Sequence, residues 1–182
     1  MRVRSPDKIS RQFALWEGSG SRSTQRRNPI AVYRTDLEID ASAEQVWAVL
    51  IDFESYPDWN RSLPAISGEL REGSTVSLTL AMPGRPSLNV KAQLQEVTPN
   101  RRLTWHGNVG ADWLFAGDRE FAIHPLAEDK VRFTHVEDVH GLLFPVFRAL
   151  MGSAIQRHHD TLNSSLKNRA EALAAQAAAE PS

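Results

Sequence analysis

The feature that most constrains the fold is a long apolar stripe towards the C-terminus. Apolar residues recur there at intervals of three and four positions, which is the period of one face of an α-helix. Pro145 can begin this helix, because the first helical turn has N–H groups without intrahelical partners in any case. The stripe comprises Phe147, Leu150, Met151, Ala154, Ile155, His158, Leu162, Leu166, Ala170 and Leu173. A helix of about eight turns with one apolar face needs a second layer to cover that face.

Alternating apolar and polar residues predict that this second layer is a β-sheet. Residues 32–40 alternate clearly, with Tyr33, Leu37 and Ile39 on one face. Further strands are expected in residues 63–71, 76–82, 88–94, 103–105, 121–123 and 131–139. Short loops with turn residues separate these segments, which favours antiparallel pairing.

Two short helices are expected between the first two strands. Ser42 and Gln45 have the spacing of a capping box, which begins a helix over residues 43–50. Residues 52–59 then read as a helical turn broken by Pro57. The order of elements predicts an α+β fold in which a curved, seven-stranded antiparallel sheet wraps the long C-terminal helix. A strongly curved sheet does not close tightly on one helix, so an apolar cavity for a small ligand is expected between them.

The chain of 182 residues is long enough for one domain, which we expect over residues 31–175. Residues 1–30 contain seven basic and two acidic residues and no sustained apolar period. They are predicted to form a disordered basic N-terminal tail. Residues 176–182 are predicted to be a frayed C-terminus because they follow the end of the apolar stripe.

Composition excludes several classes of function. The 21 Lys and Arg residues are balanced by 22 Asp and Glu residues, so no overall attraction to nucleic acid is expected. The absence of cysteine excludes disulfides, thiolate nucleophiles and cysteine-ligated metals. No apolar run approaches the ~18 residues of a membrane span, and the chain shows no signal-peptide pattern. A cytoplasmic protein without a cofactor and without a transmembrane segment is therefore expected.

One set of motifs runs through the predicted domain, namely Ala43 to Leu50 with Asp52 and Phe53, Tyr56 to Asn60, Gly68 to Gly73, Phe133 to Glu137 with Gly141 to Leu143, and the terminal helix. These motifs resemble the START/Bet v1-like (SRPBCC) superfamily, and within it bacterial proteins labelled polyketide cyclase/dehydrase or lipid transport. The resemblance covers residues 31 to about 172, and it implies a helix-grip fold. It implies a structural role for Tyr56 to Asn60 at one end of the cavity. The superfamily includes ligand carriers, cyclases, hydroxylase subunits and chaperone co-activators, so the resemblance specifies fold better than function.

Strand parity identifies three polar residues that face the cavity. A hairpin with residues 127–129 as its loop places Arg119 opposite Glu137, and His135 opposite Phe121. A slip of one residue would break the apolar face of the strands, which favours this register. Arg119 and Glu137 are then a cross-strand ion pair, with His135 beside it. Two interpretations stay open, namely an ion pair that closes the strand ends and a polar group that orients a ligand.

Candidate ligand-binding residues follow from the same parity, from the helix stripe and, for Trp59 and Trp105, from their place as large aromatic residues near the predicted cavity walls. They are Arg119, His135, Glu137, Trp59, Trp105, Phe121, Phe133, Phe147, Met151 and Ile155. His106 and His124 are expected to face outwards, and His158 is expected to be a partly buried core residue. No H-x-E-x-H pattern occurs, so no metal site is predicted.

These features leave three functions open. The leading interpretation is a carrier or sensor that binds a small hydrophobic ligand such as a lipid, a polyketide-like aromatic or a quinone. An alternative is a metal-independent enzyme of the cyclase or dehydratase type, with His135 as the acid or base. A third is a protein-interaction module, which the apolar loop at residues 113–115 and the basic tail suggest.

Overall fold

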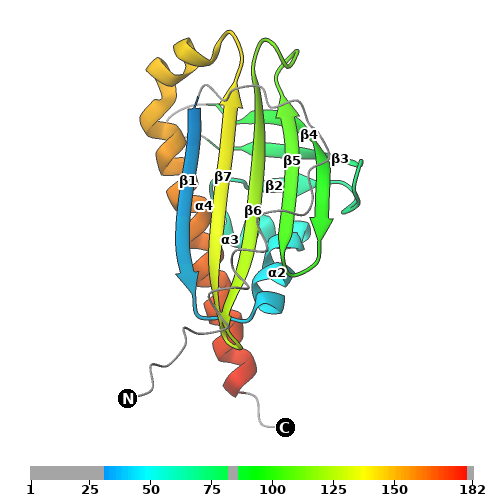
Figure 1. Cartoon of the computed structure of the whole chain (residues 1–182), viewed down its shortest axis with the longest axis vertical. Helices are drawn as coiled ribbons and strands as arrows, with labels where there is room; N and C mark the ends of the chain where they lie inside the picture. Colours follow the sequence, from blue (N-terminus) through cyan, green and yellow to red (C-terminus); the bar gives the residue numbers. More distant parts are fainter. Residues whose placement is uncertain (1–30, 82–85, 180–182) are drawn as a thin grey trace, which may run out of the picture.

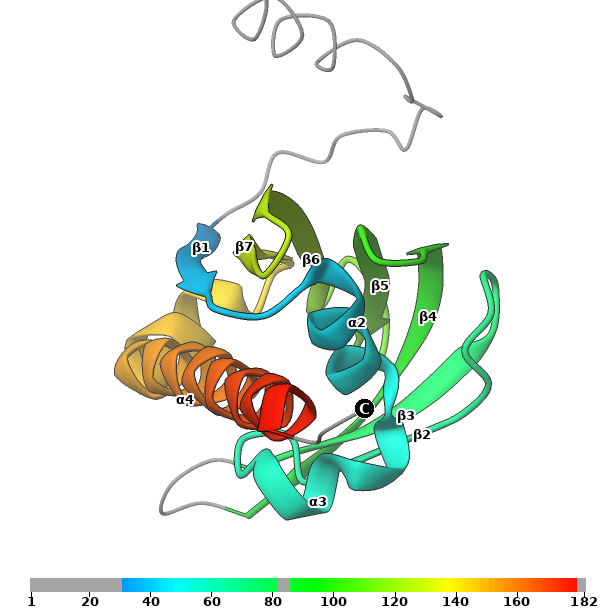
Figure 2. The same ribbon diagram turned by 90° about the horizontal axis from the view of Figure 1, so that it is seen from below.

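The apolar C-terminal stripe forms helix α4 (Phe144–Ala179), which lies across the concave face of one curved sheet (Figures 1 and 2). The structure is a computed structural model that describes residues 31–81 and 86–179, without the side chains of residues 150–153. The expected tail at residues 1–30 lies outside the described residues. Within the described part of the chain, no helix is both long and apolar enough to cross a bilayer.

The sheet has seven antiparallel strands in the order β1-β7-β6-β5-β4-β3-β2, which confirms the expected helix-grip architecture. The first and last strands are neighbours, because β1 pairs with β7 along its whole length. The strands are β1 (Ala31–Ile39), β2 (Ala65–Ser67), β3 (Thr75–Leu80), β4 (Leu88–Thr98), β5 (Arg102–Asn108), β6 (Ala116–Ala127) and β7 (Lys130–His140).

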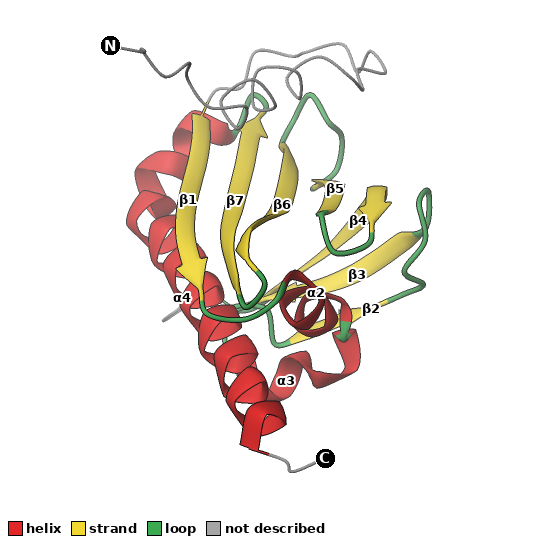
Figure 3. Cartoon of the chain, turned by 60° about the horizontal axis from the view of Figure 1, so that its bottom comes forward, coloured by secondary structure: helices red, strands yellow, loops and turns green. Residues whose placement is uncertain are grey.

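The short helices α2 (Ala43–Ile51), η1 (Phe53–Ser55) and α3 (Tyr56–Trp59) follow β1. The predicted capping box is confirmed. The Ser42 hydroxyl accepts a hydrogen bond from the Gln45 N–H at 3.2 Å, and the Gln45 side chain accepts one from the Ser42 N–H at 2.9 Å. Figure 3 shows α2 and α3 beside the C-terminal half of α4, where they cover one end of the sheet.

The core is dense at one end of the domain and thin at the other. Leu162, Leu166 and Ala170 on the C-terminal half of α4 belong to a large buried cluster with α2 and the inner face of the sheet. On the N-terminal half, Phe144 is buried at the start of the helix, and Ala154 and Ile155 form a small separate cluster with a few partly buried neighbours. Space between helix and sheet is therefore expected at the N-terminal half of α4.

Two details differ from the sequence-based expectation. The second strand spans three residues instead of 63–71, because Gly68 has a φ of +139° and its Cα approaches the Thr75 carbonyl too closely for a side chain. The register of the hairpin between β6 and β7 is confirmed, with Phe121 opposite His135. Its loop is tighter than expected, since Ala127 pairs with Lys130 and a bulge absorbs the extra residue.

Two loops meet at the thin end of the core. The loop after β5 (residues 109–115) and the loop after β7 (residues 141–143) are joined by backbone hydrogen bonds from Leu142 N to Trp113 O and from Leu143 N to Leu114 O, at 2.9 and 3.0 Å. Gly141 makes this junction possible. Its φ is +118°, and a Cβ at this position would lie 2.6 Å from the Leu114 carbonyl oxygen.

Gly141→Ala is therefore expected to lower the free energy of unfolding more than Gly73→Ala. Gly73 also has a positive φ, of +81°, but a Cβ there would meet no atom within 4 Å. Its substitution should cost about 1 kcal/mol of backbone strain, whereas Gly141→Ala should cost about 3 kcal/mol because the two loops must also separate. Urea denaturation of both variants measures the difference. Equal losses would show that the loop junction tolerates a side chain at residue 141.

Candidate functional site

A cavity of about 100 Å³ lies between the inner face of the sheet and the N-terminal half of α4. Its walls come from β3 to β7, from the loop after β5 and from α4, and they are mostly aliphatic and aromatic. Since one water occupies about 30 Å³ of liquid, the space corresponds to about three waters. Arg119, Glu137 and His158 are the ionisable residues of the lining. The pattern, apolar walls with a few polar groups, is typical of a small-molecule site.

The structure brings together half of the residues that the sequence suggested for ligand contact. Trp105, Phe147 and Ile155 line the cavity together with Arg119 and Glu137. The others do not: Trp59, Phe121 and Phe133 pack in the large core cluster and His135 is sealed beneath the cavity, while the side chain of Met151 lies outside the described residues.

The resemblance implied that Tyr56 to Asn60 lies at one end of the cavity. None of these residues lines the cavity, and the segment has a structural role elsewhere. The Tyr56 hydroxyl donates a hydrogen bond to the Leu50 carbonyl at 2.7 Å, and burial raises the pKa of this phenol. The Asn60 side chain accepts hydrogen bonds from two backbone N–H groups, at 3.0 and 3.1 Å. The segment thus fixes the chain between α2 and β2 at the dense end of the core.

Glu137 joins the sheet to the helix. One of its carboxylate oxygens accepts a hydrogen bond from Arg119 Nη2 at 2.9 Å, across the β6–β7 pair that the sequence predicted. The other accepts a hydrogen bond from His159 Nε2 on α4. Burial alone would raise the pKa of Glu137, but the Arg119 charge and the bond from His159 outweigh it and hold this pKa well below its usual range. The carboxylate is therefore ionised.

His135 lies behind this ion pair, in a fully buried position. Its ring stacks flat on His159, with centroids 4.1 Å apart and an interplanar angle of 2°. Its Nδ1 is 2.9 Å from Oδ1 of Asn163, to which it donates a hydrogen bond. Burial and the nearby Arg119 charge lower the pKa of His135 far below its usual value, so the ring is neutral.

His158 forms part of the cavity wall, where the sequence suggested a core residue. Its side chain is almost fully buried, and the ring makes only a weak hydrogen-bonding contact with the backbone of Ala81 among the described residues. Burial, aided by repulsion from Arg119, lowers the pKa of His158 to about 4. The ring is therefore a neutral group that can accept or donate one hydrogen bond at the cavity.

His159 and Asn163 are the site residues that sequence reasoning missed. Both follow directly after members of the apolar stripe, His158 and Leu162, and neither belongs to the stripe. They lie four and eight positions after Ile155, so all three share one side of the helix. This spacing could have identified them. It places His159 and Asn163 on the side of the helix that faces the sheet, where a buried polar residue requires a polar partner.

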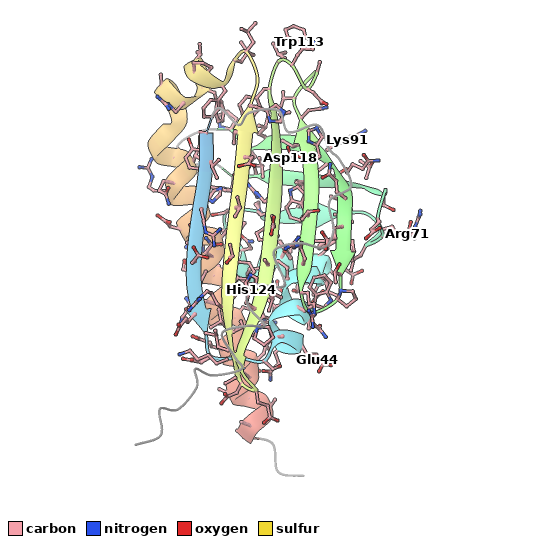
Figure 4. The ribbon with its side chains drawn as sticks, in the orientation of Figure 1. Glu44, Arg71, Lys91, Trp113, Asp118 and His124 are labelled. Atoms are coloured by element: carbon pink, nitrogen blue, oxygen red, sulfur yellow. The ribbon has the colours of Figure 1, made fainter. Side chains whose placement is uncertain are left out.

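The outer face of the sheet holds a second polar cluster, around His106. Its ring nitrogens lie 2.8 Å from Asp118 and 3.3 Å from Asp112, which ties the loop after β5 to the sheet. The hydrogen bond to Asp118 is the main reason why the pKa of His106 is raised. His106 is thus half-buried where exposure was expected, while His124 on the same face is exposed as expected (Figure 4). Among the described residues, no group of His, Asp and Glu is arranged to hold a metal ion.

Comparison with known proteins assigns this architecture to a family. Residues 31–171 match the model of a family described as polyketide cyclase/dehydrase and lipid transport. No curated protein matches the sequence significantly.

Several solved structures share the fold. The Zhui aromatase/cyclase from Streptomyces sp. R1128 has a TM-score of 0.65 and 15% identity, over 78% of this chain and 93% of that chain. A START superfamily protein from Mycobacterium smegmatis has a TM-score of 0.61 and 24% identity, over 78% and 98%. Norcoclaurine synthase from Thalictrum flavum has a TM-score of 0.60 and 15% identity, over 80% and 97%. At these identities, the likeness establishes the fold alone.

Glu137→Gln is expected to lower the free energy of unfolding by about 3 kcal/mol, because it leaves the buried Arg119 charge without its counterion. Glu38→Gln is a matched control that removes an exposed carboxylate paired with Lys130, and its effect should be much smaller. Chemical denaturation at pH 7 measures both. Similar losses in the two variants would mean that the buried pair contributes no more than a surface pair.

His158 should make the domain less stable as the pH falls from about 6.5 to about 4. The unfolded ring binds a proton near pH 6.5, whereas the folded ring stays neutral until about pH 4, so folding expels a proton in this window. At about 1.4 kcal/mol per pH unit, the loss is about 3 kcal/mol.

Unfolding free energies of wild type and His158→Gln between pH 7.5 and 4 isolate this contribution. The variant should show a shallower pH dependence, whereas His124→Gln, on the exposed outer face, should retain most of it. Parallel curves for wild type and His158→Gln would contradict a neutral, buried His158.

Proposed function

Because the chain belongs to the polyketide cyclase/dehydrase and lipid-transport family, we propose that it binds a small apolar molecule that carries one hydrogen-bond acceptor. The acceptor end binds Arg119 inside the cavity, and the apolar body contacts the surrounding aliphatic and aromatic walls. The protein acts as a carrier or sensor of this ligand.

The observation that carries this proposal is the incomplete hydrogen bonding of Arg119. The side chain is 5% exposed, and its Nη2 binds Glu137, but its Nε and Nη1 have no hydrogen-bond partner in the described part of the chain. The Trp105 ring lies 6.0 Å from the guanidinium carbon and contributes a cation–π contact without accepting these N–H groups in a hydrogen bond. A buried donor without a partner costs about 1–3 kcal/mol, so a ligand that brings an acceptor recovers this energy.

The lining also limits the chemical class of the ligand. A carbonyl, a carboxylate or a phenolate can accept from Arg119, and lipids, polyketide-like aromatics and quinones each contain such a group. The neutral His158 adds one further hydrogen-bonding position on the opposite wall without adding a charge. An apolar body with a single polar end therefore fits the cavity better than a sugar or a nucleotide, which carries many polar groups.

The volume indicates how the ligand lies. About 100 Å³ is below the ~300 Å³ at the lower end of drug-sized ligand sites. The cavity therefore takes one small group, and the remainder of a larger ligand extends towards the surface through its open side. Val109 is a lining residue that is 40% exposed, so this extension passes the loop after β5.

A second candidate function is proton transfer on a bound carbonyl compound. Arg119 can stabilise an enolate oxygen while His158 accepts the proton from the neighbouring carbon, since both residues line the cavity. His135, which the sequence suggested for this role, does not reach the lining. A pKa of about 4 makes His158 a weak base at neutral pH, and binding is the first proposal for this reason.

The test compares acetophenone with ethylbenzene, which are matched in size and differ in one carbonyl group. Wild-type protein is expected to bind acetophenone about tenfold more tightly, because one hydrogen bond to a charged donor is worth about 1.5 kcal/mol or more. The double variant Arg119→Met/Glu137→Gln should bind both probes equally, and it avoids leaving Glu137 charged and unpaired. Ligand-observed NMR titrations give the dissociation constants.

Arg102→Met is the matched control, because Arg102 is a half-exposed arginine on β5 that pairs with Glu96 and Glu120. It should retain the preference for acetophenone. Equal affinity of the two probes for wild-type protein would remove the role of Arg119, and no binding of either probe would remove the ligand-binding proposal altogether.

A further inference from the structure

Apolar side chains protrude at the end of the domain that holds the cavity. They come from the loop after β5, from the loop after β7 and from the first turn of α4, and together we name them the apical patch. The apical patch comprises Val109, Trp113, Leu142, Leu143 and Val146. Trp113 is 64% exposed and Leu142 is 70% exposed, whereas large apolar side chains are usually mostly buried. Figure 4 shows Trp113 at the extreme end of the molecule.

The apical patch has an ordered backbone. The hydrogen bonds from Leu142 N to Trp113 O and from Leu143 N to Leu114 O hold the two loops together. Beneath them, the rings of Phe115 and Phe147 pack with centroids 4.7 Å apart. The protruding side chains are therefore presented as one fixed surface, and they are not tips of independent loops.

The apical patch adjoins the cavity. Val109 belongs to both, and Phe115 and Phe147 line the cavity directly below the exposed residues. If the protein binds a ligand as proposed above, a water-insoluble ligand enters and leaves the cavity past the apical patch. An apolar surface at this place lets the ligand pass between the cavity and another apolar phase without crossing water.

We propose that the apical patch docks on the surface of a lipid bilayer that contains anionic lipids. Trp113 is the residue type that favours the boundary between headgroups and acyl chains, and Leu142 and Val146 supply the apolar contact below it. The molecule binds by this one end and does not span the bilayer.

The described residues near the apical patch carry mixed charge, because Asp112, Asp118 and Asp138 lie at this end of the sheet, so the preference for an anionic surface rests on basic residues beside them. Arg148 is exposed on the first turns of α4. The described chain begins at Ala31, which pairs with Val139 two residues before Gly141, so residues 1–30 are attached at this same end. That segment carries seven basic and two acidic residues, and basic residues close to anionic headgroups strengthen docking. The nearby carboxylate of Asp112 is bound by Asn108 and His106.

Flotation of the full chain with phosphatidylcholine vesicles, with and without 30% phosphatidylserine, tests the proposal. Wild-type protein should float with the anionic vesicles and lose binding as salt rises. Trp113→Ser/Leu142→Ser should reduce the bound fraction at least tenfold. Leu126→Ser is the matched control, because Leu126 is 45% exposed at the opposite end of the sheet, in β6 next to its hairpin with β7, and it should bind like wild type.

The other possible occupants of the apical patch give distinct results. Concentration-dependent dimers that Trp113→Ser/Leu142→Ser abolishes, in a protein that does not float, would identify a second copy as the occupant and overturn the proposal. Deletion of residues 1–30 should weaken binding to anionic vesicles. Stronger binding after the deletion would show that this segment covers the apical patch, which would also overturn the proposal.

Acetophenone titration without vesicles separates this proposal from the ligand-binding function. Trp113→Ser/Leu142→Ser should bind acetophenone like wild type, because neither residue lines the cavity. Failure of flotation with intact acetophenone binding overturns membrane docking alone. Flotation of a protein that binds no probe supports docking and removes the function on which its interpretation as ligand exchange rests.

Discussion

The rest of the structure depends on one buried carboxylate, that of Glu137. It accepts hydrogen bonds from Arg119 on the neighbouring strand and from His159 on the helix, so one ionised group fixes strand to strand and sheet to helix. A buried charge tolerates little displacement of its partners, because each loses several kcal/mol when left alone. This constraint sets the position of α4 against the sheet. It also marks the boundary between the filled core below and the cavity above.

Much of the fold could be predicted, because sheets and helices have fixed periods. The alternation along β6 and β7 sets which residues face inwards, and this alone placed Arg119 opposite Glu137. The period does not determine the rotation of α4 about its axis to within one residue, so the predicted stripe includes His158 and leaves out His159. Its ring instead seals His135 from the cavity, and His158 takes the place on the wall. Such details depend on side-chain packing between layers, which a periodic pattern does not specify.

The candidate site combines features that stability alone does not explain. Arg119 retains two donors without acceptors, and His158 is a buried imidazole without a hydrogen-bond partner of good geometry in the described chain. Groups of this kind cost folding energy, and a ligand that supplied hydrogen-bond partners would recover part of it. Both lie on the wall of one small apolar space, beneath loops that present a large exposed indole. In the proposed function, binding, exchange and docking thus all belong to one end of the domain, while the large core cluster lies at the opposite end.

The pairing of β1 with β7 has a consequence for biosynthesis. Ala31 pairs with Val139 and Ile39 with Val131, so about 100 residues separate strands that lie side by side. During translation, β1 has no neighbour until almost the whole sheet has been made, and α4 follows only after that. Contacts of such sequence separation form slowly, since a long loop must close before they contribute. The nascent chain therefore carries an unpaired strand and an uncovered apolar sheet face until β7 and then α4 have been synthesised.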